Sequence, residues 1–165
     1  MMARLLLIVL TLGLVAGSAP APSHGHFAPA SGRYGWPLGG TPTVVRRFDP
    51  PPQPWLAGHR GVDLAGAPGE PVRAAGAGVV VFAGMLAGRG VVSVAHDGGL
   101  RTTYEPVVPA VLAGERVELG ALLGTLATGH AGYPGTCLHW GLRSGSTYLD
   151  PLSLVGLGRV RLLPL

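Results

Sequence analysis

Glycine and proline interrupt this chain so often that little room is left for a helix. The 165 residues include 28 glycines and 16 prolines, and beyond residue 34 no stretch of ten residues combines helical apolar spacing with recognisable caps. Short runs rich in β-forming residues stand between the glycines instead. These runs cover residues 72–75, 78–83, 90–96, 100–106, 116–119, 122–127 and 138–143. The pattern predicts an all-β domain, a small antiparallel barrel or sandwich.

The glycines and prolines also indicate where the connections lie. Segments 79–84 and 91–99 are expected to pair as strands, with a turn at Asp97-Gly98. The glycines of segment 111–124 are spaced like the corners of a compact barrel, where positive φ angles are needed. Residues 49–54 contain four prolines, which remove backbone donors, so we expect a stiff loop just before His59.

The N-terminal residues have the pattern of a secretory signal peptide. Arg4 precedes a nearly unbroken apolar run over residues 5–15, and small residues follow, whereas a membrane-spanning helix needs about 20 apolar residues. We expect cleavage between Gly17 and Ala21, with an uncleaved membrane anchor as the alternative. The expected organisation is a signal peptide over 1–21, a flexible linker over 22–33, one domain over 34–156 and a tail over 157–165.

Export and charge constrain the partners. We expect a secreted monomer of the cell wall that has no stable membrane insertion after signal cleavage. Cys137 is the only cysteine, so it forms no intramolecular disulfide, and no cysteine lies near the cleavage region to carry a lipid. All 12 basic residues are arginines, and loss of Arg4 leaves 11 against 8 acidic groups, a difference of +3. This charge suits an anionic wall polymer, although a modest positive balance also serves solubility; scattered arginines and export argue against nucleic acid.

Three residues, His59, Asp63 and His139, are the candidate metal ligands. A catalytic zinc typically takes three histidine or carboxylate ligands and leaves a fourth position open. In a strand, Cys137 and His139 project from one face, while Leu138 and Trp140 project from the other. His59 and Asp63 are four residues apart, which suits a loop that enters a strand and folds onto one ion. The set therefore predicts a zinc site that favours hydrolysis over a structural role.

Several motifs in order resemble the lysostaphin and LytM type of zinc metallopeptidase, whose members cleave peptide bonds in bacterial peptidoglycan. The resemblance runs from about residue 34 to residue 156. It rests on segments 69–80 and 111–124 and on the motifs His59-Arg60-Gly61-Val62-Asp63-Leu64, Leu138-His139-Trp140 and Tyr148-Leu149-Asp150-Pro151. The resemblance implies a small antiparallel β domain of the duplicated hybrid-motif type, with zinc bound in a groove by His59, Asp63 and His139. It also implies a zinc metalloendopeptidase that acts on peptidoglycan peptides, and the expected signal peptide indicates that this enzyme is secreted.

Two positions depart from the family pattern. Cys137 corresponds to the first histidine of a His-x-His motif, whose role in the family is to handle a proton or to stabilise the transition state. Glu105 falls at about the histidine of a Tyr-x-His motif of the family. General acid–base assistance contributes about 10²–10⁴-fold, so the chain could be a folded, zinc-loaded and slow enzyme. Alternatively, Glu105 accepts the proton, or Cys137 closes the zinc site as a thiolate. A second hypothesis is a degenerate member that binds wall material or regulates another wall hydrolase.

Other side chains are weaker candidates. His96 is expected at a strand end rather than at a metal, and His130 lies in a loop that could edge the groove. Trp55 and Tyr133 are expected in loops that flank the groove, where they contact substrate or cover the core. A lipoyl or biotinyl carrier would suit the strands of segment 72–83, but the chain has no lysine for attachment.

Overall fold

The computed structural model describes residues 32–53, 55–129 and 135–157. Within these residues the chain forms strands and two short 3₁₀ helices, with no α-helix and no helix long and apolar enough to cross a membrane. The elements are β1 (Val44–Arg46), β2 (Gly61–Ala65), β3 (Pro71–Arg73), β4 (Gly78–Leu86), β5 (Arg89–Ala95), η1 (Asp97–Gly99), β6 (Leu100–Glu105), β7 (Val107–Pro109), β8 (Arg116–Val117), β9 (Leu122–Leu126), β10 (Cys137–Ser144), β11 (Thr147–Leu149) and η2 (Pro151–Val155). The expected signal peptide, most of the linker and the tail beyond 157 lie outside the described residues, as do His130 and Tyr133.

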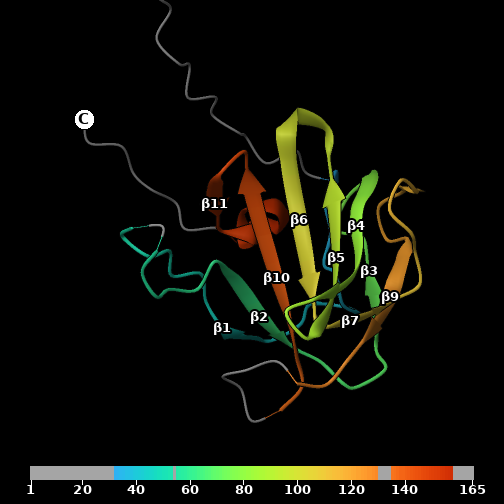
Figure 1. The fold of residues 1–165 in the computed structure, drawn as a ribbon, viewed down its shortest axis with the longest axis horizontal. Coiled ribbons are helices and arrows are strands. Elements are labelled where there is room, and N and C mark those ends of the chain that lie inside the picture. The colour runs from blue at the N-terminus through green and yellow to red at the C-terminus, as the bar shows by residue number, and fades with distance from the viewer. Residues whose placement is uncertain (1–31, 54, 130–134, 158–165) are drawn as a thin grey trace, which may run out of the picture.

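Two antiparallel sheets share one core. The larger sheet has the order β1-β2-β10-β6-β5-β4-β8, with β11 paired to β10, and the smaller has the order β3-β9-β7 (Figure 1). Val72 and Leu123 of the smaller sheet belong to the same buried cluster as Val92, Leu138 and Trp140 of the larger. The fold is therefore all-β and antiparallel, as predicted, and resembles a sandwich rather than a closed barrel.

Each predicted run corresponds to a strand, but one connection was assigned wrongly. β4 and β5 do pair, yet they are joined by a tight turn at Ala87 and Gly88, whose φ angles are +50° and +82°. The Asp97-Gly98 turn instead joins β5 to β6. Strands β1, β7 and β11 were not predicted, because runs of three residues beside prolines, glycines or charged groups carry little periodic signal.

The proline-rich loop before His59 and the glycine corners are as expected. Asp49 and His59 form an antiparallel bridge, with backbone N···O distances of 2.9 and 2.7 Å, so the loop closes on itself and fixes the start of β2. Gly114 and Gly120 have φ angles of +96° and +79°, which residues other than glycine rarely adopt. These turns allow the segment between β7 and β9 to cross the end of β4.

Candidate metal centre

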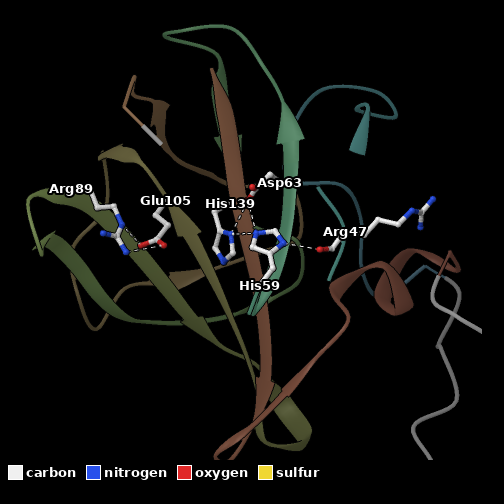
Figure 2. Close-up of polar contacts among 6 residues, drawn as sticks. All are labelled: Arg47, His59, Asp63, Arg89, Glu105 and His139. Atoms are coloured by element: carbon white, nitrogen blue, oxygen red, sulfur yellow. Dashed lines mark hydrogen bonds and ion pairs between the residues drawn. The ribbon is translucent and has the colours of Figure 1, made fainter. Parts of the chain in front are cut away.

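The three predicted ligands meet where β2 and β10 pair in the larger sheet. Asp63 lies on β2, and His139 lies directly opposite it on β10. Residues paired across antiparallel strands project from the same face, so their side chains are neighbours. His59 precedes β2 and is held by its bridge to Asp49. Figure 2 shows the two imidazoles and the carboxylate converging on one point.

The ligand atoms are close enough together for one small cation. Oδ1 of Asp63 lies 2.9 Å from Nε2 of His59 and 2.8 Å from Nδ1 of His139, and the two nitrogens are 3.1 Å apart. Ligands at about 2.0–2.1 Å from a tetrahedral zinc lie about 3.3 Å from one another, so a small expansion of this triangle would accommodate the ion. Two imidazoles and a carboxylate are also donors that zinc prefers. The residues fit a zinc ion.

The hydrogen bond on the far side of His59 sets its tautomer. Nδ1 lies 2.7 Å from the carbonyl oxygen of Arg47, which can only accept, so Nδ1 carries the proton. In the neutral ring Nε2 is then an acceptor that faces a carboxylate oxygen of Asp63 at 2.9 Å. Two acceptors at this distance repel each other unless a cation or a proton lies between them. A ligating histidine oriented by an outer carbonyl has this arrangement.

Gly61 makes room for the ring of His139. A Cβ atom added at this glycine would lie 2.5 Å from the carbonyl oxygen of Trp140 and 2.7 Å from Nε2 of His139. Both distances are far below van der Waals contact, and the first neighbour is backbone. The glycine in the His59 motif is therefore required by the close approach of β2 to β10.

Glu105 lies on the other side of His139. Strand β6 pairs it directly with His139, so Asp63, His139 and Glu105 form a row across three neighbouring strands. Both carboxylate oxygens of Glu105 accept from Arg89, with Nε–Oε2 and Nη2–Oε1 distances of 2.9 and 3.3 Å (Figure 2). The carboxylate thus lies in the groove, as its proposed role as a proton acceptor requires, but a guanidinium holds both oxygens.

Cys137 is a fully buried thiol two residues before His139. Burial, and to a lesser extent the charge of Asp63, raise the pKa of this thiol to about 11, so it is protonated at neutral pH. A protonated thiol is a poor base. Among the described residues, the group whose ligating atoms lie within 4.8 Å of one another consists of His59, Asp63 and His139. The geometry thus favours a buried thiol over a fourth zinc ligand.

A groove of about 650 Å³ runs past the metal centre. His59, His139 and Glu105 line it, together with five arginines: Arg46, Arg60, Arg89, Arg101 and Arg143. The arginines are scattered along the sequence, and their convergence in one groove was not predicted. The signal was the two-residue alternation, which places Arg101 on the face of Glu105 and Arg143 on the face of His139.

Two of the weaker candidates, His96 and Trp55, lie within the described residues. His96 is buried behind the sheet, where its Nδ1 donates to the carbonyl of Ala77 at 2.8 Å and its Nε2 accepts from the hydroxyl of Thr102 at 2.7 Å. This agrees with its expected place beside a strand end and away from the metal. Trp55 is 79% exposed, so it does not cover the core. Its contact with substrate stays a prediction.

Comparison with known proteins gives a family and a fold. Residues 57–151 match the sequence model of Peptidase family M23. Uncharacterized proteins of Mycobacterium tuberculosis and Mycobacterium bovis are 53% identical over 150 residues, which are 88% of this chain and 59% of each relative. The chain therefore spans about three fifths of the length of these relatives.

Solved structures share the fold. The catalytic domain of lysostaphin from Staphylococcus simulans is 24% identical, with a TM-score of 0.60 over 70% of this chain and 92% of that domain. A zinc-containing peptidase from Vibrio cholerae has a TM-score of 0.57 at 24% identity, over 68% of this chain and 36% of its own. A chain of the SpoIIQ–SpoIIIAH pore-forming complex has a TM-score of 0.65 at 22% identity, over 74% and 90%.

Proposed function

This chain belongs to peptidase family M23, and from that membership and the metal centre we propose that it is a zinc metalloendopeptidase acting on bacterial peptidoglycan peptides. The observation that carries the proposal is the convergence of His59, Asp63 and His139 at the side of a groove. Zinc held by such a set supplies Lewis acidity, which polarises a scissile carbonyl and acidifies water. An open groove beside the ligands provides space for a peptide.

Residues of the chain orient the metal ligands and set the charges around them. The Arg47 carbonyl fixes His59, and the ladder between β2 and β10 holds Asp63 opposite His139. The buried carboxylate of Asp63 is the one negatively charged ligand of the three. Arg89, held by Glu105, presents a guanidinium in the same groove, where it can bind a substrate carbonyl or an oxygen that gains charge.

The test is zinc-dependent release of amino groups from purified cell walls of several peptidoglycan types. We expect release from the zinc-loaded protein, and its loss both after chelation and in His59→Ala. Arg116→Gln, an exposed change on β8, is the matched control and should leave release unchanged. If fully zinc-loaded protein released nothing from any wall type, the peptidase proposal would be abandoned.

A degenerate wall-binding or regulatory domain is the second candidate. It is favoured by the buried thiol of Cys137 and the arginine-bound carboxylate of Glu105 at the positions of the family's auxiliary histidines. A related fold also occurs in the SpoIIQ–SpoIIIAH pore-forming complex. Activity that appears only in Cys137→His would support degeneracy. High activity in the natural sequence, unchanged by that substitution, would support the enzyme.

We also propose that the protein is exported through its N-terminal signal sequence and acts as a monomer in the cell wall. The apolar run over residues 5–15 and the small residues after it support this proposal. Mass spectrometry of the mature protein should give a new N-terminus between residues 18 and 22. An intact Met1 on protein from the membrane fraction would instead indicate an uncleaved anchor.

A further inference from the structure

Two arginines face each other at one end of the groove. Arg101 on β6 and Arg143 on β10 are paired in the ladder, so their side chains project from the same face. Like charges directly opposite each other destabilise an antiparallel pair. Burial, and then the charge of Arg143, lower the pKa of Arg101. The fold thus holds two cations together at a cost in stability.

No acidic side chain offsets this cost within the described residues. None of their carboxylates lies within 4.0 Å of Arg101 or Arg143, and the acidic residue that lines the groove, Glu105, is bound to Arg89. Tyr148 on β11 pairs with Arg143, and the guanidinium of Arg60 lies 5.7 Å from the centre of its ring. An anion from outside would therefore be stabilised between Arg101 and Arg143.

The floor of the groove connects the two arginines to the metal centre. The same two strands carry three successive pairs on this face: Glu105 with His139, Thr103 with Gly141, and Arg101 with Arg143. A Cβ added at Gly141 would meet nothing closer than 3.7 Å, so packing does not demand a glycine at this position. Because Gly141 has no side chain, the groove is deeper here than it would be above a larger residue. Four residues of strand separate His139 from Arg143, which corresponds to about 13 Å.

We propose that Arg101 and Arg143 form a carboxylate-binding subsite that selects peptides with a free carboxylate three to four residues from the cleaved bond. The spacing follows from the 13 Å path, because an extended peptide advances about 3.3–3.6 Å per residue. Guanidinium groups match a carboxylate through paired N–H donors, and two of them can bind both oxygens. The selectivity for a cleaved bond rests on the proposed peptidase function, whereas the anion site itself does not.

The first experiment needs no metal. Side-chain NMR signals of Arg101 and Arg143 in the zinc-free protein are followed during titration with acetyl-Gly-Gly-Gly-Glu-amide and with the matching Gln peptide. We expect saturable shifts with the Glu peptide alone, and binding about tenfold weaker in Arg101→Gln and in Arg143→Gln. Arg116→Gln removes the same charge outside the groove and should bind as the natural protein does. Equal binding of the Gln peptide, or an equal loss in Arg116→Gln, would overturn the subsite.

The second experiment tests the spacing in the zinc-loaded protein. Oligoglycine hydroxamates chelate zinc through one end and carry a single Glu one to six residues away. Affinity should peak at three or four residues and lose that peak in Arg143→Gln, whereas a flat series refutes the spacing. Failure of the glycine-only hydroxamate to bind would count against the zinc centre and leave the NMR result standing. A phosphoserine peptide that binds more tightly than the Glu peptide would indicate a phosphate site and overturn the assignment to carboxylates.

Discussion

Replacing Gly61 with alanine should damage the metal centre although the residue carries no ligand. The new Cβ would lie 2.5 Å from the carbonyl oxygen of Trp140 and 2.7 Å from Nε2 of His139. Relief of the first clash to about 3.4 Å requires β2 and β10 to separate by about 0.9 Å, which weakens the ladder that sets Asp63 opposite His139. Overpacking of this kind costs about 1–3 kcal/mol.

Two measurements test this reasoning. Thermal unfolding of the zinc-free protein should show a lower Tm, at about 2–8 °C for each kcal/mol. Zinc affinity, measured by competition with a chelating dye, should fall about 10–100-fold, as when a residue that orients a ligand is lost. Gly141→Ala is the matched control, since Gly141 is the ladder partner of Gly61 and its Cβ would find ordinary contacts. If the two variants had equal Tm and zinc affinity, the close approach would not be what requires Gly61.

The remaining predictions use simpler changes. Zinc at about 100 times its Kd should stabilise the protein by about 2.7 kcal/mol, and calorimetry with and without chelator checks this. Glu105→Gln should lower kcat by less than about tenfold, because both oxygens already accept from Arg89; a fall of about 10²–10⁴-fold would instead identify Glu105 as the proton acceptor. Burial lowers the pKa of His96 despite its bond to Ala77 and the nearby Asp97, so the unfolded state binds more protons below about pH 6.5 and stability falls as the pH falls. Denaturant unfolding of zinc-free protein between pH 7 and 5 should show a shallower dependence in His96→Gln, and an identical slope would contradict the assignment.

The buried polar network around His96 could not be predicted from the sequence. Tyr104 donates to Thr102, Thr102 donates to His96, and the backbone N–H of Ala75 donates to the Tyr104 hydroxyl. Each polar group has a partner, so a buried histidine and tyrosine are accommodated in the core. In sequence, these residues show only an alternation of polar and apolar types that also suits a half-exposed strand.

The hydrogen-bond partner of Glu105 could not be predicted from the motif in which this residue lies. The family resemblance implied that this residue lies near the metal ligands, and the ladder between β6 and β10 does pair it with His139. Its hydrogen bonds to Arg89 were not foreseen, because Arg89 is sixteen residues away on β5. The chemistry of a carboxylate depends on its neighbours, and those neighbours are brought together only by the order of strands in the sheet.

By itself, the sequence determined the class of fold, the family and the three candidate ligands. Glycine spacing, short β-rich runs and ordered motifs are local properties, and they carry over directly into strands, turns and ligand positions. Tertiary structure alone decided the state of Cys137, the partner of Glu105 and the convergence of Arg101 with Arg143. Burial, cross-strand register and the sum of charges over a groove depend on residues far apart in the chain, which no local pattern records.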